Sequence, residues 1–386
     1  MTDRTLTGAY AALLGADPAE ARRSADRLAG LARLFPRHIR YGLFAGLAAL
    51  DAAARATTGH RLASLDAGQG EALCTVLAAR PAGRQLAEAL KLPMLLAAGA
   101  DRPARSAGHA ESARPEPPLA CVPAAQWPAR ATADAIVVGS GAGGAMAARE
   151  LARAGLRVVI CEEGRRFTVA DFRDRPIVDR FTALYRDGGA TVALGLPPIL
   201  LPLGRGVGGT TLVNSGTCYR TPDRVLRRWR DGFGVPAADP DRFGHLLDEV
   251  ERTLAVAPTP VKILGRNGLL ALAGAQRLGW RAAPLRRNAP GCGGCCECVV
   301  GCPRNAKYGV HLNALPQACA AGAVIVTGAR VDRVLVDRAP GGRARAAGVA
   351  FGGHEILAPL VVVAAGAVET PRLLRRSGLG RHPGLG

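Results

Sequence analysis

One segment of the 386-residue chain limits the fold more than any other, because it combines two strands, a helix and a glycine pattern in a fixed order. An apolar strand at 134–138 is followed by a Gly-x-Gly-x-x-Gly turn made by Gly139, Gly141 and Gly144. A helix at 145–154, a second strand at 156–161 and the carboxylate of Glu162 come next. This succession predicts a β–α–β unit of the dinucleotide-binding kind. We therefore expect an α/β fold with a Rossmann-like sheet.

Each part of this segment has a physical role in holding a dinucleotide. Gly139 permits the tight turn, Gly141 lets the backbone approach a pyrophosphate, and Gly144 lets the helix pack closely on the strand. The helix N-terminus offers free N–H groups to the phosphates. Glu162 is placed to accept hydrogen bonds from ribose hydroxyls and disfavours a 2′-phosphate, so FAD and NAD both remain open at this point.

The composition along the chain predicts three regions. Residues 1–100 carry helical periodicity, with Asp17 as an N-cap before a proline, and form a helical N-terminal extension. Residues 101–131 are rich in Pro, Ala and Arg and are typical of a linker. Residues 132–386 form the nucleotide-binding domain, with an excursion over 165–310. Further strands of its parallel sheet are expected at 324–326, 331–336, 346–351 and 360–364.

Charge and hydropathy exclude several classes of protein. The formal net charge is +19, but only three of the 50 basic residues are lysines and the arginines are scattered, which does not predict a nucleic-acid-binding patch. No apolar run reaches the ~20 residues of a membrane span, and no signal peptide is evident. We expect a cytoplasmic protein, with peripheral membrane association left open.

Two further glycine-containing stretches resemble a known family. Residues 204–214 are similar to the first signature of the glucose–methanol–choline (GMC) oxidoreductases, and residues 366–380 are similar to the second. Within this family the resemblance is to bacterial and plant long-chain alcohol oxidases, which segments 185–189 and 214–222 also resemble. A helical N-terminal extension is typical of that branch. The resemblance implies an FAD-binding domain and FAD as the cofactor.

The resemblance also implies roles for particular residues beside the flavin and the adenine. Glycines without side chains would let the backbone approach the flat flavin, and small polar residues would lie beside it. With the dinucleotide glycines and Glu162, the implied cofactor-binding residues are Gly204, Gly208, Gly209, Thr210, Asn214, Val331, Gly366, Ala367 and Thr370.

A cysteine-rich segment leaves three interpretations open. Cys292, Cys295, Cys298 and Cys302 have the spacing of a bacterial ferredoxin half-motif, and Cys296 is an additional thiol. The segment also resembles cysteine-rich stretches of sugar dehydrogenases and alcohol oxidases of the same family. An iron–sulfur cluster on Cys292, Cys298 and Cys302 is one interpretation. A structural zinc and reduced thiols without metal are the others.

The family's catalytic histidine has no counterpart in the sequence motifs of this chain. In relatives it lies beyond the second signature, so we expect the catalytic residue beyond Gly386 and the substrate domain to be incomplete. None of the seven histidines has the family's catalytic context, and a hydrogen-bonding role is expected for His311. The chain therefore resembles the FAD-binding half of a truncated alcohol oxidoreductase.

The resemblance implies hydride transfer from the CH–OH group of an alcohol to the flavin, with a histidine accepting the alcohol proton. The expected partners are a long-chain alcohol and an electron acceptor, either oxygen or a quinone or electron-transfer partner. One alternative is an FAD sugar or polyol dehydrogenase subunit that contains an iron–sulfur cluster. The alternative of another class is a non-catalytic flavin-binding fragment or one half of a split enzyme.

Overall fold

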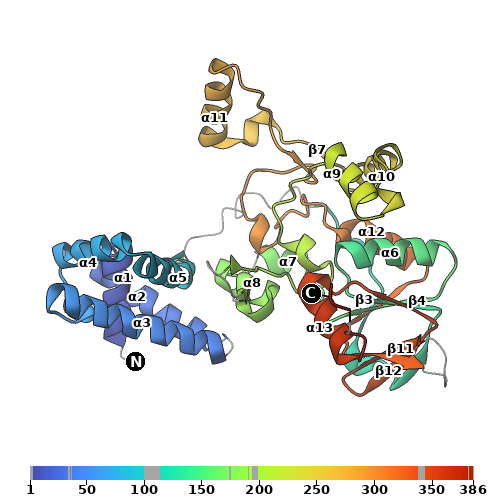
Figure 1. The fold of residues 1–386 in the computed structure, drawn as a ribbon, viewed down its shortest axis with the longest axis horizontal. Helices are drawn as coiled ribbons and strands as arrows, with labels where there is room; N and C mark the ends of the chain where they lie inside the picture. The colour runs from blue at the N-terminus through green and yellow to red at the C-terminus, as the bar shows by residue number, and fades with distance from the viewer. Residues whose placement is uncertain are drawn as a thin grey trace. The chain divides into compact units, whose positions relative to one another are not determined.

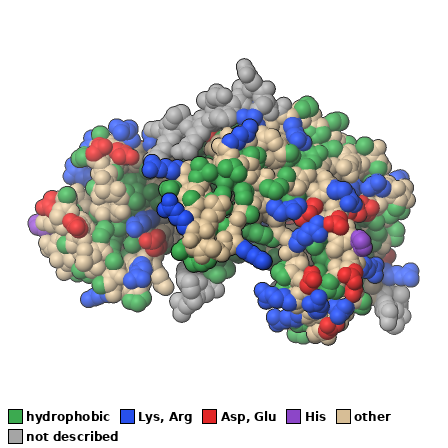
Figure 2. Space-filling model, turned by 90° about the horizontal axis from the view of Figure 1, so that it is seen from above, with side chains coloured by type: hydrophobic (Ala, Val, Ile, Leu, Met, Phe, Trp, Pro, Cys, Tyr) green, Lys and Arg blue, Asp and Glu red, His purple; other side chains and the backbone are tan. Residues whose placement is uncertain are grey.

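The computed structural model of the chain describes residues 3–33, 35, 37–99, 114–173, 175–189, 191–193, 199–337, 344–380 and 382–385. The chain divides into two structural units. Unit 1 consists of Met1–Ala104 and Arg175–Leu203, and unit 2 consists of Arg105–Asp174 and Gly204–Gly386. Basic side chains are spread over both units on the face shown in Figure 2.

Unit 1 contains the expected helical extension (Figure 1). Its N-terminal helices are α1 (Asp3–Leu14), α2 (Pro18–Ala32), α3 (Arg37–Thr58), α4 (Ala67–Ala79) and α5 (Pro81–Ala98). The predicted cap of α2 is confirmed, because the Asp17 side chain accepts hydrogen bonds from the backbone N–H groups of Ala19 and Glu20. Asp66 forms a capping box with Gln69 at the start of α4.

The core of unit 1 is built mainly from Leu and Ala on the inner faces of these helices. Leu28, Leu47 and Leu73 are fully buried. Tyr10 is also buried and donates a hydrogen bond to the Met94 carbonyl at 3.0 Å. The same unit includes a later segment of the chain, which forms α8 (Ile177–Leu184) and the small strands β5 (Val192–Ala193) and β6 (Ile199–Leu200).

Unit 2 is organised around a parallel sheet. Its described strands are β1 (Cys121–Pro123), β3 (Ala135–Val138), β4 (Val158–Glu162), β9 (Val324–Thr327) and β13 (Leu360–Val363), in the order β1-β9-β4-β3-β13. Helices α6 (Ala142–Arg153) and α12 (Ala314–Ala320) cover one face (Figure 1). Ala135 and Val137 point toward these helices, whereas Ile136 and Val138 belong to the core on the other face. This alternation places apolar side chains on both faces of β3.

A second sheet covers the other face and corrects part of the sequence prediction. Strands β10 (Arg333–Asp337), β11 (Arg345–Phe351), β12 (His354–Leu357) and β2 (Arg130–Thr132) form it, with antiparallel pairing except between β12 and β2. The segments 331–336 and 346–351 were expected in the parallel sheet and lie here instead. Their apolar residues pack against the parallel sheet. Because these residues are buried, the two segments have the same apolar composition as strands of a parallel sheet.

The region expected to be a linker also carries secondary structure. Cys121–Pro123 forms the edge strand β1 of the parallel sheet, and Arg130–Thr132 forms β2 of the second sheet. Both strands have only three residues and lie at sheet edges, where proline is tolerated. Because the surrounding sequence is rich in proline, these two short strands were not predicted from the sequence. Residues 101–113, the first part of the expected linker, lie outside the described residues.

The excursion within unit 2 adds short helices and strands. They are α7 (Val169–Arg173), α9 (Asp223–Arg227), α10 (Pro240–Thr253), β7 (Ala257–Pro258), α11 (Gly265–Arg277) and β8 (Arg286–Arg287), and α13 (Gly366–Arg376) follows the last strand. Among the described residues, no helix combines the length and apolar character needed to cross a membrane.

Candidate functional site

The glycine turn after β3 has the geometry that the sequence predicted. Gly139 has φ +98°, and a Cβ atom there would lie 2.6 Å from the Ala364 carbonyl oxygen. A Cβ atom on Gly144 would overlap the Gly139 carbonyl, so the close packing of α6 on β3 requires glycine. Gly141 is the N-cap of α6 and no side chain caps this helix. The first-turn N–H groups of α6 are therefore free to bind an anion.

Glu162 is the last residue of β4 and is buried against the glycine turn. Its carboxylate accepts hydrogen bonds from Ser140 Oγ at 2.5 Å, Ser140 N at 3.1 Å and Gly164 N at 2.9 Å. Burial raises the pKa of Glu162, and these hydrogen bonds oppose that shift. A carboxylate can accept about four hydrogen bonds, so capacity remains for a ribose hydroxyl.

The glycine-rich loop at 204–214 lies directly beside the first glycine turn. Gly208 has φ +106° and donates its N–H to Ser140 Oγ at 3.0 Å. A Cβ atom on Gly209 would lie 2.9 Å from the Gly141 Cα atom. A Cβ atom on Gly141 would meet no atom nearer than the Gly209 Cα atom at 4.0 Å, so space is open next to Gly141. The two glycine segments therefore form one cradle.

Ser140 is a residue that sequence reasoning missed. It occupies the first variable position of the Gly-x-Gly-x-x-Gly turn, is fully buried, and connects Glu162 to Gly208. Its small hydroxyl between two glycines was the available signal. The Gly-x-Gly-x-x-Gly pattern does not specify which residues occupy its variable positions. The role of Ser140 can therefore be recognised only from the folded structure.

Lys307 is a buried residue that binds the backbone at the end of the loop at 204–214. It is 2% exposed, and its Nζ donates hydrogen bonds to the carbonyls of Leu212 at 2.7 Å, Asn214 at 2.8 Å and Cys298 at 2.8 Å. Burial lowers the pKa of Lys307 to about 8. The ammonium group therefore links the glycine-rich loop to the cysteine-rich segment.

His311 lies on the same side of the loop and does not make the hydrogen bond expected of it. Its Nδ1 atom is buried and has no hydrogen-bond partner among the described residues. A Cβ atom on Gly208 would lie 3.3 Å from the His311 Cβ atom. Burial, together with the positive charges of Lys307 and Arg166, lowers the pKa of His311 to about 3. The imidazole is therefore neutral at physiological pH.

The other expected cofactor-binding residues follow strands of the parallel sheet or belong to the glycine-rich loop. Val331 comes after β9, and Gly366, with φ +84°, starts α13 directly after β13. Ala367 and Thr370 lie in the first turns of α13. Thr210 Oγ1 accepts a hydrogen bond from Gly204 N at 3.2 Å, which closes the loop on itself. Ligands of open α/β sheets bind at this carboxyl edge.

The cysteine-rich segment does not show the cluster site that one of its three interpretations requires. Within the described residues, no group of three or more His, Cys, Asp or Glu side chains is placed to hold a metal ion, and the ten cysteines are free thiols. Cys298 Sγ accepts a hydrogen bond from Arg287 at 3.0 Å, and Cys302 Sγ accepts one from Lys307 N at 3.4 Å. Because no such group is found among the described residues, the structure gives no support to Cys292, Cys298 and Cys302 as iron–sulfur ligands.

The cradle suits FAD by three separate features. The first-turn N–H groups of α6 have no side-chain cap, Glu162 lies at the end of β4 with its carboxylate against the glycine turn, and Gly208 and Gly209 let the second loop pack directly on that turn. Each feature comes from a different segment of the chain. The parallel sheet brings these segments together at one edge.

Comparison with known proteins agrees with this geometry. The GMC oxidoreductase family profile matches residues 181–386, and an FAD-binding domain profile matches residues 134–172. A GMC-type oxidoreductase of Mycobacterium tuberculosis is 56% identical over 359 residues, which are 91% of this chain and 57% of that relative. A long-chain-alcohol oxidase of Arabidopsis thaliana is 36% identical over 269 residues, which are 67% of this chain and 35% of that relative.

A solved formate oxidase has a similar fold. It superimposes with a TM-score of 0.50 at 15% sequence identity, over 67% of this chain and 50% of that chain. The chain thus spans between about a third and a little over half of the relatives named here. The family profile covers more than half of the chain, and the Mycobacterium relative covers most of it. The chain belongs to the GMC oxidoreductase family.

Proposed function

We propose that this chain carries the FAD-binding half of an oxidoreductase that acts on the CH–OH group of long-chain alcohols. The observation that carries the proposal is the meeting of two glycine segments, in which Ser140 connects Glu162 to Gly208. The Arabidopsis relatives named as long-chain-alcohol oxidases support the substrate class. When bound, FAD supplies the hydride acceptor.

The residues of this chain position the cofactor. The first turn of α6 binds the pyrophosphate through its N–H groups, and Glu162 orients the ribose. The loop containing Gly208 and Gly209 supports the flavin ring, and Lys307 fixes that loop through the Leu212 and Asn214 carbonyls. Gly204, Thr210, Val331, Gly366, Ala367 and Thr370 complete the proposed cofactor site.

Among the residues that the structure describes, we assign the proton acceptor to no histidine. His311 lies beside the glycine-rich loop, but it is buried and its pKa is lowered to about 3. An imidazole in this environment holds a proton poorly, because the charged form is desolvated. A catalytic base works best with a pKa near the operating pH.

Two measurements on the purified, FAD-loaded chain test this proposal. Titration with 1-dodecanol should change the flavin spectrum, whereas glucose should leave it unchanged. The reverse result would favour a sugar or polyol dehydrogenase. Anaerobic mixing with 1-dodecanol should leave the flavin oxidised. Reduction of the flavin by the alcohol would show that the chain contains its own base, and His311→Gln would be the first variant to examine.

A further inference from the structure

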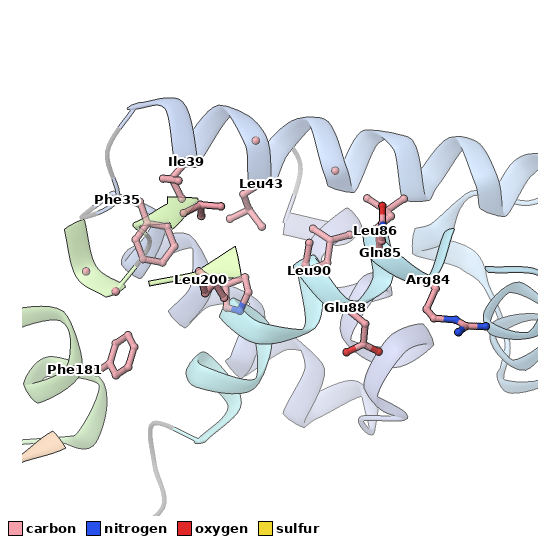
Figure 3. A pocket seen from close by; sticks show the side chains of 17 residues that line it. Phe35, Ile39, Leu43, Arg84, Gln85, Leu86, Glu88, Leu90, Phe181 and Leu200 are labelled. Atoms are coloured by element: carbon pink, nitrogen blue, oxygen red, sulfur yellow. The ribbon is translucent and has the colours of Figure 1, made fainter. Parts of the chain in front are cut away.

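Unit 1 contains a cavity of about 580 Å³ that the flavin site does not use. Helices α3 and α5 contribute to its walls, together with the later residues Phe181, Gly188, Gly189, Val192 and Leu200 (Figure 3). The interior is apolar, with side chains that include Phe35, Ile39, Leu43, Leu90, Phe181 and Leu200. A volume of this size lies in the range of about 300–1,000 Å³ typical of small-molecule sites.

The lining residues of the cavity follow the two helices. On α5 they extend from Arg84 to Pro93, which is about 14 Å at 1.5 Å per residue. On α3 they extend from Ile39 to Gly46, which is about 10 Å. An apolar space bordered over this length can accommodate an unbranched aliphatic chain.

The polar groups of the cavity are gathered at one end. Arg84, Gln85 and Glu88 lie on α5, away from Phe35 and Phe181 at the other end (Figure 3). Arg84 donates a hydrogen bond to the Ala78 carbonyl at 2.9 Å, and Glu88 pairs with Lys91 at 3.4 Å. Both charges thus have partners. The Gln85 amide can donate and accept, as a hydroxyl group does.

Two glycines of α3 line the cavity and have different roles. A Cβ atom on Gly46 would lie 3.1 Å from the Leu90 Cδ2 atom, so this glycine allows α3 and α5 to approach closely. A Cβ atom on Gly42 would meet nothing within 4 Å, because it would point into open space. Glycine in a helix interior costs about 1 kcal/mol relative to alanine. Atoms lining an unfilled apolar space also lack dispersion partners, which an apolar ligand would supply.

We propose that this cavity binds the unbranched aliphatic chain of a single-chain amphiphile, with a neutral hydroxyl head group at Gln85. The apolar lining would surround the chain, and the exposed polar end of α5 would keep the head group in contact with water. This site lies wholly within unit 1. It goes beyond the proposed flavin chemistry and does not depend on it.

Calorimetric titration of the full chain with 1-dodecanol, with and without FAD, tests the proposal. We expect saturable binding with the same affinity in both states. Gly42→Leu should weaken binding at least tenfold, because its side chain would occupy the cavity. Its thermal stability should be unchanged or increased, since leucine is a better helix former than glycine.

The matched control is Gly30→Leu. Gly30 is also a helical glycine, its Cβ would also meet nothing within 4 Å, and it lies outside the cavity. This variant should bind 1-dodecanol as the unmodified chain does. Absence of binding to the unmodified chain, or equal binding by Gly42→Leu, would overturn the proposal. Preference for dodecanoate over 1-dodecanol would overturn the neutral head group. Binding to the FAD-free chain reports on the cavity alone, so its absence there leaves the flavin proposal intact.

Discussion

Ser140 Oγ donates a 2.5 Å hydrogen bond to Glu162 Oε2, and this contact joins the glycine turn after β3 to the end of β4. The same hydroxyl oxygen accepts the Gly208 N–H, so one buried side chain contacts both glycine segments of the cofactor site. Each partner of Ser140 belongs to a different part of the sequence. The geometry of the cradle therefore depends on a residue that is not among the cofactor-binding residues predicted from the sequence.

Ser140→Ala should weaken both the fold and FAD binding. The substitution leaves the buried Gly208 N–H without its acceptor and removes a donor from Glu162, at a cost of about 1–3 kcal/mol. We expect a fall in the urea midpoint and a loss of FAD affinity of about tenfold. Ser215→Ala, at an exposed serine, is the control and should change neither. Unchanged FAD affinity in Ser140→Ala would show that the cradle does not need this connection.

Gly141→Val should abolish FAD binding while preserving the fold. Gly141 has φ −68°, and a Cβ atom there meets no protein atom closer than 4.0 Å, so a β-carbon fits at this position without strain. Its branched side chain would occupy the position proposed for the pyrophosphate. Circular dichroism should be unchanged and flavin absorbance lost from the purified protein. Gly274→Val, in open space on α11, should keep its flavin. Retained flavin in Gly141→Val would refute the assignment.

Lys307→Met should destabilise unit 2 by roughly 2 kcal/mol or more. The change removes three charge-assisted hydrogen bonds and leaves the Leu212, Asn214 and Cys298 carbonyls without this donor. Urea denaturation measures the loss, and hydrogen exchange should be faster over residues 209–214. Lys262→Met removes an exposed lysine and is the control. Equal stability of the two variants would contradict the role of Lys307.

Acid should destabilise the chain partly through His311. Its pKa is about 3 in the folded state and about 6.5 when exposed, so the unfolded chain binds more protons between these values. Stability from this residue is therefore lost as the pH falls below 6.5, by about 2 kcal/mol at pH 5. Burial raises the pKa of Glu162, which has the opposite sign, so the measurement is a difference between two proteins.

His311→Gln should show a flatter decrease of unfolding free energy between pH 6.5 and pH 5 than the unmodified chain. The control is His245→Gln, because His245 is exposed on α10. That variant should keep the original slope. Parallel pH profiles for His311→Gln and the unmodified chain would show that His311 does not titrate as its burial requires.

The cysteine-rich segment should behave as reduced thiols. Protein purified without oxygen should contain no stoichiometric iron, acid-labile sulfide or zinc. A thiol reagent should modify Cys296 first, because it is the exposed thiol of the segment. Stoichiometric iron with labile sulfide would restore the ferredoxin-type interpretation.

Local patterns were sufficient to predict the β–α–β unit and the helical extension. The strand before Gly139, the helix after it and the cap at Asp17 depend on neighbours in the sequence, and the structure confirms all three. The family resemblance identified the second glycine-rich segment. What the patterns could not show was that 331–336 and 346–351 pair antiparallel in a second sheet, since strands buried on one core share the same apolar residues.

The sequence by itself determined the fold class and the family and predicted the glycines of the proposed cofactor cradle, because these depend on short motifs with fixed spacing. Tertiary structure alone decided how the motifs are joined. Ser140 meets Gly208 across 68 residues, and Lys307 meets Leu212 across 95. The cavity of unit 1 needs α3, α5 and a segment about 100 residues later in the chain. Long-range packing sets such contacts, and no local spacing records them.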